Sequence, residues 1–252
     1  MLILSKNELF RKTADLISRL FYPENIYCAC CGDSMEGTTR IHGICDKCAG
    51  KIRWISDNPF RSSMDEFAFD ELLACCIYGW YPRQIIHRFK LGGCTYLARP
   101  LGKLLAERIR MSAAPEDFDG VCFIPSAPEK LARRGYNQAR LLAEEAAKEL
   151  GLPLLPVLQK PHDTASMRLS SGSARRTMLD DAFQIDPALQ KRIEGARLLL
   201  VDDVLTTGST TDEAARTLKA AGCKTVCVAV FASSTGNHVW KEDPEDAAEP
   251  LW

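Results

Sequence analysis

Two adjacent carboxylates follow a run of apolar residues near the end of the chain. Leu198 to Val201 form that run, and a short loop rich in hydroxyl groups comes after the acids. Gly208 in this loop lets the backbone approach a ligand closely, since glycine has no side chain. The first N–H groups of the helix predicted to follow suit phosphate, whereas carboxylates suit sugar hydroxyls or a bound Mg²⁺. We therefore predict a sugar-phosphate site whose acids are Asp202 and Asp203 and whose phosphate side is Thr206, Thr207, Gly208, Ser209 and Thr210. The alternative is an acidic strand end followed by an ordinary helix cap.

A second candidate segment is basic and joins a predicted strand to a predicted helix. It begins with Pro125 and Ser126 and carries three cations, Lys130, Arg133 and Arg134. Because guanidinium groups bind phosphate oxygens in a bidentate manner, the segment is a candidate for holding pyrophosphate. Taken alone, these residues favour the alternative of a solvated basic loop with Asn137 as the N-cap of the next helix.

Two Cys-x-x-Cys pairs lie thirteen residues apart near the start of the chain. They are Cys28 with Cys31 and Cys45 with Cys48. Four thiolates at this spacing converge tetrahedrally on Zn²⁺, and a module this small needs metal to fold. Cys30 lies between two ligands and can replace Cys31 in a different register. The remaining cysteines lie mostly in apolar segments, where they behave as small hydrophobic residues.

The elements that must position these residues follow from hydrophobic periodicity and capping signals. Strands are predicted over residues 72–78, 121–124, 198–201 and 224–232. Helices are predicted over residues 82–90, 97–109 and 137–150, and from a capping box at residues 210–213 to Gly222. Short apolar strands alternating with helices predict an α/β fold, a doubly wound and mostly parallel sheet covered on both faces. Ligands of such sheets bind at the carboxyl ends of the strands.

Changes in composition along the chain suggest the domain boundaries. We expect an N-terminal amphipathic helix over residues 1–22, a zinc-ribbon-like module over 23–56, the α/β domain over 71–235 and an acidic tail over 236–252. The polar stretch over 56–70 is predicted to be a linker.

Composition limits the classes of function. The chain has 252 residues, a formal net charge of -1 and 11 cysteines. Near-neutral charge gives no whole-chain argument for nucleic-acid binding, so any such site must be local. No stretch approaches the roughly 20 apolar residues of a membrane-spanning helix, so we expect no membrane insertion. The absence of an export signal and the odd number of cysteines favour a reducing cytoplasm over a disulfide framework.

The segment over residues 198–210 resembles the phosphoribosyl-diphosphate (PRPP) motif of type I phosphoribosyltransferases: four apolar residues, two acids and a Thr-Thr-Gly loop. The resemblance implies that Asp202 and Asp203 bind the ribose 2′ and 3′ hydroxyls. It implies in the same way that the hydroxyl loop holds the 5′-phosphate.

A narrower resemblance comes from Arg134-Gly-Tyr-Asn-Gln138, which is similar to a motif of the ComF family of competence proteins. That family also has an N-terminal cysteine module and a segment ending in a lysine before a glycine-rich turn. The lysine corresponds to Lys90 and is expected to face the pyrophosphate. Between the two motifs the chain departs from the family, because Met167 stands where glutamine is expected and Thr177 follows the arginines. This departure falls in the expected mobile loop and bears on catalysis more than on PRPP binding.

Two functions follow from these resemblances. The first is a ComF-like protein that binds PRPP with Mg²⁺ and takes part in DNA uptake and natural transformation, handling single-stranded DNA beside a competence helicase. Basic and aromatic residues around the cysteine module are candidates for contacting the strand: Arg40, His42, Lys47, Lys51, Arg53 and Trp54. The alternative is an active phosphoribosyltransferase of nucleotide metabolism or salvage with an unknown acceptor.

Overall fold

The computed structural model describes residues 26–36, 40–56, 66–161 and 182–234. It divides into a small unit that ends at Lys51 and a large unit that begins at Ile52. The expected N-terminal helix and acidic tail lie outside the described residues. None of the described helices combines the length and apolar character needed to cross a bilayer.

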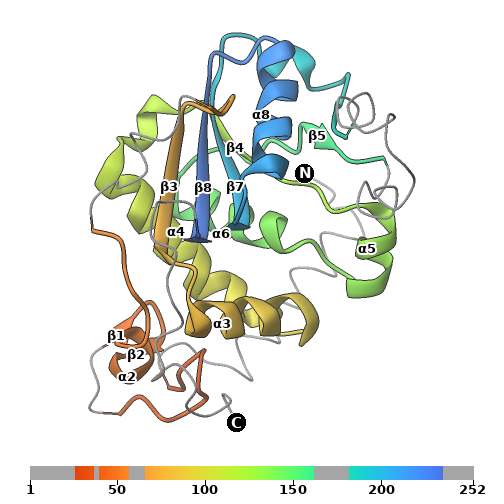
Figure 1. The fold of residues 1–252 in the computed structure, drawn as a ribbon. Helices are drawn as coiled ribbons and strands as arrows, with labels where there is room; N and C mark the ends of the chain where they lie inside the picture. Colours follow the sequence, from red (N-terminus) through yellow and green to blue (C-terminus); the bar gives the residue numbers. More distant parts are fainter. Residues whose placement is uncertain (1–25, 37–39, 57–65, 162–181, 235–252) are drawn as a thin grey trace, which may run out of the picture. The chain divides into compact units, whose positions relative to one another are not determined.

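The described part of the small unit consists of turns and short elements (Figure 1), and it contains the four cysteines. A two-residue turn joins β1 (Arg40–Ile41) to β2 (Ile44–Cys45), and the short helix α2 (Asp46–Ala49) follows directly. The N–H of Ala29, in the first Cys-x-x-Cys pair, donates to the carbonyl of Gly43 in this turn. The hairpin therefore holds the two cysteine pairs together.

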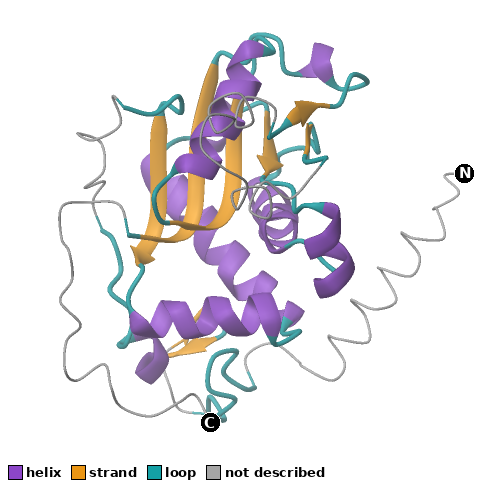
Figure 2. Cartoon of the chain, turned by 45° about the vertical axis from the view of Figure 1, so that its right-hand side comes forward, coloured by secondary structure: helices purple, strands orange, loops and turns teal. Residues whose placement is uncertain are grey.

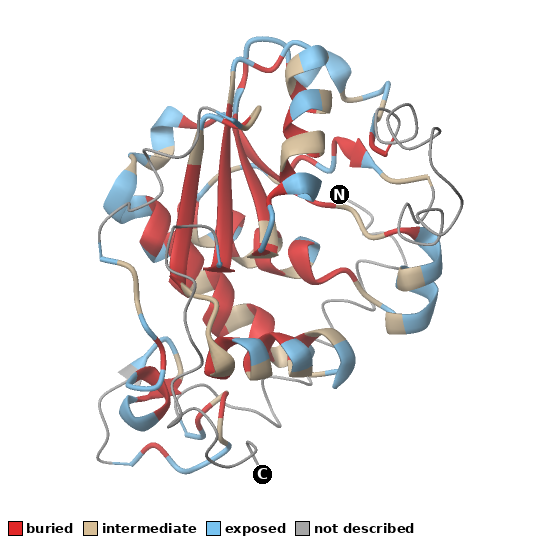
Figure 3. Ribbon diagram, in the orientation of Figure 1, coloured by how far each residue is buried: buried red, intermediate tan, exposed pale blue. Residues whose placement is uncertain are grey.

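The large unit contains a sheet of four parallel strands in the order β3-β8-β7-β4 (Figure 1). Its strands are β3 (Glu71–Ile77), β4 (Gly120–Phe123), β7 (Arg197–Leu205) and β8 (Thr225–Ser233). Nearly all residues of β4, β7 and β8 are buried (Figure 3), which explains why the strands are continuous apolar runs rather than alternating ones. The prediction of an α/β fold with a mostly parallel sheet is confirmed.

Helices cover both faces of this sheet (Figure 2). α4 and α6 pack against each other and on the sheet, whereas α8 lies on the opposite face against β7 and β8. The helices of the large unit are α3 (Trp80–Leu91), α4 (Ala98–Ser112), α5 (Pro128–Arg134), α6 (Gln138–Leu150) and α8 (Ser209–Ala220). A separate antiparallel pair, β5 (Leu158–Gln159) with β6 (Gln184–Ile185), completes the described strands.

The structure corrects the sequence prediction at the junction of β7 and α8. The strand continues through both acids to Leu205, because Asp202, Val204 and Leu205 still pair with β8. The expected capping box at residues 210–213 is wrong. The helix begins at Ser209, and its N-cap is Gly208, which has a left-handed backbone. Thr211 donates its hydroxyl hydrogen to the carbonyl of Gly208 instead.

Two stretches that the sequence prediction assigned to the cysteine module and to the linker belong to the large unit instead. Arg53 and Ile55 exchange backbone hydrogen bonds with β3, forming an antiparallel addition at the edge of the sheet. Farther along, Phe69 is buried, and Asp70 accepts from the N–H of Val226 and pairs with Lys219. The small unit therefore ends earlier than residue 56, and residues 66–70 belong to the fold.

Candidate functional site

The two acids lie where β7 loses one of its neighbours. On one side β8 pairs with β7 as far as Leu205. On the other side the last bond from the β4 segment is that of the Ile124 N–H to the carbonyl of Val201. Asp202 and Asp203 follow this bond, so they lie at the carboxyl edge of the sheet beside the chain that leaves β4. This is where the parallel-sheet argument predicts ligand binding.

Asp202 and Asp203 are in different environments. Adjacent residues of a strand point to opposite faces, and their burial reflects this. Asp203 is 4% exposed, while Asp202 is partly exposed. The N–H of Asp203 donates to Oδ1 of Asp202 at 2.8 Å, which folds the Asp202 carboxylate back over the strand. The acids are neighbours in sequence, but they are not equivalent acceptors.

Asp203 is paired with Lys90 of α3. The Lys90 Nζ lies 2.9 Å from the Asp203 Oδ1. Burial acts to lower the pKa of Lys90, but the Asp203 carboxylate outweighs it, so that the pKa is raised. The structure thus brings together two of the predicted site residues that lie 113 positions apart.

Asp202 has a strongly shifted pKa. Burial raises it from the ordinary 3.8 to about 7, and repulsion by Asp203 adds to the effect. Attraction by Lys90 and Lys160 and the backbone hydrogen bond from Asp203 oppose the shift. A carboxyl that titrates near neutral pH is typical of a ligand-binding or catalytic position.

The phosphate loop has the form expected from its residues. The hydroxyls of Thr207 and Ser209 lie 3.0 Å apart, and both side chains are exposed together with those of Thr206 and Thr210. The first bond within α8 runs from the N–H of Asp212 to the carbonyl of Gly208. The N–H groups of Thr210 and Thr211 precede that bond, as do the free donors at the start of any helix. Hydroxyls and backbone donors therefore share one small region.

Gly208 is required here for two reasons. Its φ of +77° is in the left-handed region, and a Cβ at this position would lie 2.6 Å from Cε1 of Phe67. Phe67 stacks on the buried ring of Phe69, with ring centroids 4.8 Å apart. The N–H of Ala68 donates to Asp212 in the first turn of α8. Residues 67–69 thus brace the phosphate loop, a contact that the sequence prediction missed because this stretch looked like a linker.

The basic segment is mainly a joint between elements. Asn137 caps α6 by accepting from the N–H of Arg140, and its Nδ2 donates to the carbonyl of Ile124 at 2.9 Å. Tyr136 donates its hydroxyl hydrogen to the carbonyl of Phe89 at 2.6 Å. The alternative prediction, that Asn137 is the N-cap of the next helix, is therefore confirmed.

The cations of α5 have mixed exposure. Arg133 is exposed, Lys130 is partly exposed, and Arg134 donates to Oε1 of Gln138 at 3.2 Å. Pro125 and Ser126 are partly exposed just beyond the end of β4. Binding of pyrophosphate by these residues stays a prediction.

Lys160 is a further residue that the sequence prediction missed. It follows β5, lies over the ring of Phe183 at 5.0 Å and contributes to the electrostatics of Asp202. The altered stretch that includes Met167 and Thr177 lies between Lys160 and Phe183, outside the described residues. An isolated lysine after a two-residue strand gave no signal in the sequence.

In the small unit the four predicted cysteines come together. The Sγ atoms of Cys28, Cys31, Cys45 and Cys48 lie within 4.8 Å of one another, and the Sγ atoms of Cys31 and Cys45 are 3.9 Å apart. Tetrahedral zinc with bonds of about 2.3 Å needs sulfur atoms about 3.8 Å apart, so this group fits zinc. The N–H groups of Cys30 and Cys45 donate to the Sγ of Cys28. Hydrogen bonds from the neighbouring thiols of Cys30 and Cys48 lower the pKa of Cys28, and the backbone N–H of Cys45 adds to the effect.

Comparison with known proteins agrees with these features. A family model described as the phosphoribosyl transferase domain matches residues 137–249. Competence protein F of Haemophilus influenzae is 29% identical over 194 residues, which cover 73% of this chain and 82% of that protein. DNA utilization protein YhgH of Salmonella typhi is 30% identical over 148 residues, or 57% of this chain and 63% of that protein. Competence protein ComFC of Streptococcus pneumoniae is 28% identical over 149 residues, which cover 59% of this chain and 62% of that protein. The chain thus spans slightly less than two thirds of the last two relatives.

Among solved structures, the glutamine PRPP amidotransferase from B. subtilis is 22% identical, with a TM-score of 0.39. That match covers 54% of this chain and 26% of the other. The fold assignment therefore rests on the strand order and the family model.

Proposed function

Because the chain belongs to the ComF family of competence proteins, whose phosphoribosyltransferase fold it shares, we propose that it binds PRPP and acts in the uptake and use of DNA. The observation that carries the PRPP proposal is the β7–α8 junction. There, two acids and a loop of hydroxyls with free helix N–H groups follow one another at the open edge of the sheet. No other described strand of the sheet continues into both kinds of group.

Different residues of the site bind the sugar and the phosphate groups. Hydroxyls of Thr206, Thr207, Ser209 and Thr210, with the N–H groups around Gly208, take the 5′-phosphate. The acids accept hydrogen bonds from the ribose hydroxyls. The cations of α5 lie on the chain that follows the neighbouring strand β4, and they take the pyrophosphate.

The carboxylate and hydroxyl oxygens at this edge are the donor type that Mg²⁺ prefers. Bound with PRPP, the ion would neutralise charge on the diphosphate. Its place would be beside Asp202, the less buried residue of the two, rather than beside Asp203.

PRPP binding is tested by calorimetry with the full chain in Mg²⁺. We expect binding by the unaltered protein and a loss of at least about tenfold in Asp202→Asn/Asp203→Asn, because each lost hydrogen bond to a charged group costs about 1.5 kcal/mol or more. Lys224→Gln, at the other end of β8, is the control and should bind as the unaltered protein does. Equal binding by all three proteins would sink the proposal.

A role in DNA handling is proposed from the relatives named for competence and DNA utilization. The small unit exposes Tyr27, Ile26 and Ile41, together with the cation Lys47. An exposed aromatic ring and an exposed cation suit stacking and phosphate contact with single-stranded DNA. Arg53 and Trp54, expected at this surface, belong instead to the large unit. A competence helicase is the proposed protein partner.

This DNA proposal predicts salt-dependent binding of a single-stranded oligonucleotide. Tyr27→Ala should weaken binding by about 1 to 3 kcal/mol, the usual value of one stacked base. Tyr96→Ala, in the large unit, is the control. An oligonucleotide that fails to bind even at low salt contradicts this part of the proposal.

Turnover is a second candidate function, and the pKa of Asp202 near 7 favours it. In that reaction an acceptor's nucleophile bonds to the anomeric carbon while the bond to the diphosphate breaks, and pyrophosphate leaves with its electron pair. Release of pyrophosphate from PRPP, measured across candidate acceptors, is the test. The cytoplasm is the proposed compartment, because none of the eleven cysteines forms a disulfide bond.

A further inference from the structure

Lys90 is the cation nearest to the acids of β7, and it reaches them from a different element. It lies in the last turn of α3, and its Nζ is 2.9 Å from Oδ1 of Asp203. The Asp203 side chain is only 6% exposed, whereas that of Lys90 is 32% exposed. A carboxylate so buried needs a partner, since an uncompensated buried charge is strongly destabilising.

Contacts of the neighbouring residues hold the backbone of Lys90 in place. Its neighbour Phe89 is fully buried, and the carbonyl of Phe89 accepts the hydroxyl hydrogen of Tyr136 at 2.6 Å. The rings of Phe89 and Tyr136 also pack together, with centroids 6.3 Å apart. On the other side of the turn, Arg88 donates to the hydroxyl of Tyr96 at 2.8 Å. Lys90 is therefore unlike a loose surface lysine, whose ion pairs contribute little.

These contacts separate the roles of the two acids. We infer that Lys90 is the fixed counter-ion of Asp203 rather than a ligand for pyrophosphate, and that Asp202 is the acid that meets the sugar hydroxyls of the ligand. The inference deepens the proposed PRPP site and rests on it. It also gives a role to Tyr136 of the Arg-Gly-Tyr-Asn-Gln motif, which becomes a positioning residue for Lys90.

The reason for such a counter-ion is the charge of the ligand. Two bare carboxylates beside a phosphate loop would repel an anionic sugar phosphate. The Lys90 ammonium places one positive charge beside the two acids, which offsets this repulsion. Lys160 after β5 acts in the same direction on Asp202. A ligand can then offer its hydroxyls to Asp202 without meeting a second unpaired carboxylate.

A double-mutant cycle distinguishes a counter-ion from a direct ligand. PRPP affinity is measured by calorimetry for the unaltered chain, Lys90→Met, Asp203→Asn and the double variant. We expect Lys90→Met to weaken binding at least tenfold and the double variant to recover most of that loss, because it contains no unpaired buried carboxylate. A double variant as weak as Lys90→Met, or weaker, would mean that Lys90 touches the ligand, and would overturn the inference.

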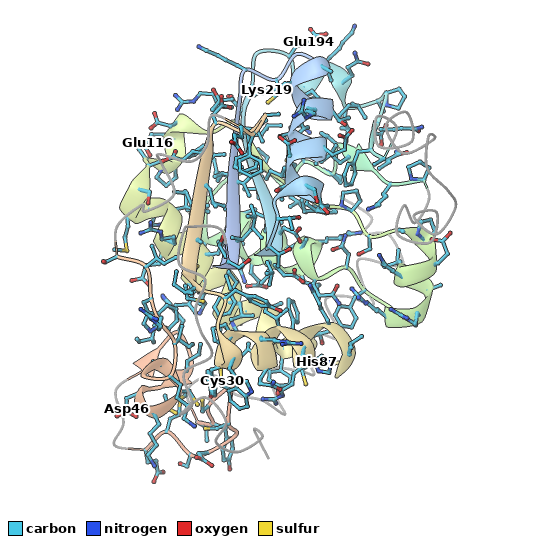
Figure 4. The ribbon with its side chains drawn as sticks, viewed as in Figure 1. Cys30, Asp46, His87, Glu116, Glu194 and Lys219 are labelled. Atoms are coloured by element: carbon cyan, nitrogen blue, oxygen red, sulfur yellow. The ribbon has the colours of Figure 1, made fainter. Side chains whose placement is uncertain are left out.

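Two further variants serve as controls for the double-mutant cycle. Lys90→Gln provides a second neutral side chain if methionine is not accommodated. Lys219→Met removes a more exposed ion pair, that with Asp70 at 2.7 Å, from the last turn of α8 (Figure 4), at the opposite end of the helix from the phosphate loop. It should leave PRPP affinity unchanged, so an equal loss there would show that the effect of Lys90 is one of general stability.

A second readout needs no ligand. The carboxyl carbon of Asp202, followed by NMR through a pH titration, reports the charges around it. Lys90→Met should move its midpoint to higher pH, and adding Asp203→Asn should move it back. If the unaltered chain fails to bind PRPP, the proposed function fails, but this titration still judges the counter-ion. A midpoint that does not respond to Lys90→Met contradicts it.

Discussion

At the scale of single residues, Asp202 makes the protein's stability depend on pH. Its folded-state pKa, about 7, lies above the ordinary 3.8, so between these values the folded protein keeps a proton that the unfolded chain has lost. Its contribution to the free energy of unfolding therefore falls as pH rises from about 4 to about 7, by up to about 4 kcal/mol. Chemical denaturation at pH 5 and pH 8 should show a fall that is smaller in Asp202→Asn. Equal falls in the two proteins would contradict the shifted pKa.

Ligand binding should depend on pH in the opposite direction. Sugar hydroxyls donate to an ionised carboxylate, so PRPP affinity should drop as pH decreases through about 7 and Asp202 takes up its proton. Calorimetry between pH 6 and pH 8.5 measures this drop. The phosphate groups of the ligand also titrate, so Asp202→Asn serves as the control and should lose the part of the drop that Asp202 causes. An affinity that rises on acidification in the unaltered protein would exclude Asp202 as the acceptor.

Gly208 offers a test of the phosphate loop at the same scale. In Gly208→Ala the new methyl group meets the Phe67 ring and the residue keeps a left-handed backbone, so we expect a loss of about 2 kcal/mol or more of stability. Gly151→Ala is the matched control, because Gly151 has a similar φ of +72° with nothing within 4 Å of the new Cβ. It should lose only the strain, about 1 kcal/mol. Equal losses in denaturant melts would remove the argument for a brace.

At the scale of elements, the sequence predicts best what depends on local pattern. The four strands of the main sheet and the helix over 138–150 lie where apolar runs and the Asn137 cap indicate. The end of β7 could not be placed from sequence, because pairing with β8 carries the strand past residues that look like a terminus. The cap of α8 was misplaced because Thr210 and Glu213 match a local signal, whereas Gly208 is selected by contact with Phe67.

The same distinction applies to the candidate site. Acids, hydroxyls and cysteines are visible as motifs, since their chemistry lies in adjacent residues. The pairing of Lys90 with Asp203, the approach of Lys160 to Asp202 and the brace at Phe67 each join segments far apart in the chain. Periodicity carries no information about such contacts, so only the fold reveals them.

Asn137 is the clearest test at the scale of elements, because it joins β4 to α6. Asn137→Ala removes the cap on α6 and leaves the carbonyl of Ile124 without this donor, so we expect a loss of about 2 to 3 kcal/mol of stability. Asn137→Ser can still cap the helix and should recover roughly 1 kcal/mol of that. Denaturant melts of the three proteins give the comparison. A serine variant no better than alanine would show that the cap contributes little.

At the scale of the whole molecule, the two units depend on different sources of stability. The large unit has its own buried sheet and helices, whereas the small unit has a few short elements around four cysteines. We therefore expect metal to be needed for the fold of the small unit but not for that of the large one. A zinc-selective chelator should remove about one Zn²⁺ per chain and abolish single-stranded DNA binding while leaving PRPP binding intact.

Amide hydrogen exchange shows which unit loses structure when Zn²⁺ is removed. After chelation the amides of Cys30 and Cys45, which donate to Cys28, should lose protection, while those of β7 and β8 keep theirs. Cys48→Ser should reproduce the result without a chelator, and Cys94→Ser, a cysteine outside the cluster, is the matched control. Loss of protection in β7, or loss of PRPP binding on chelation, would mean that the units do not fold independently. The metal would then support the PRPP site as well.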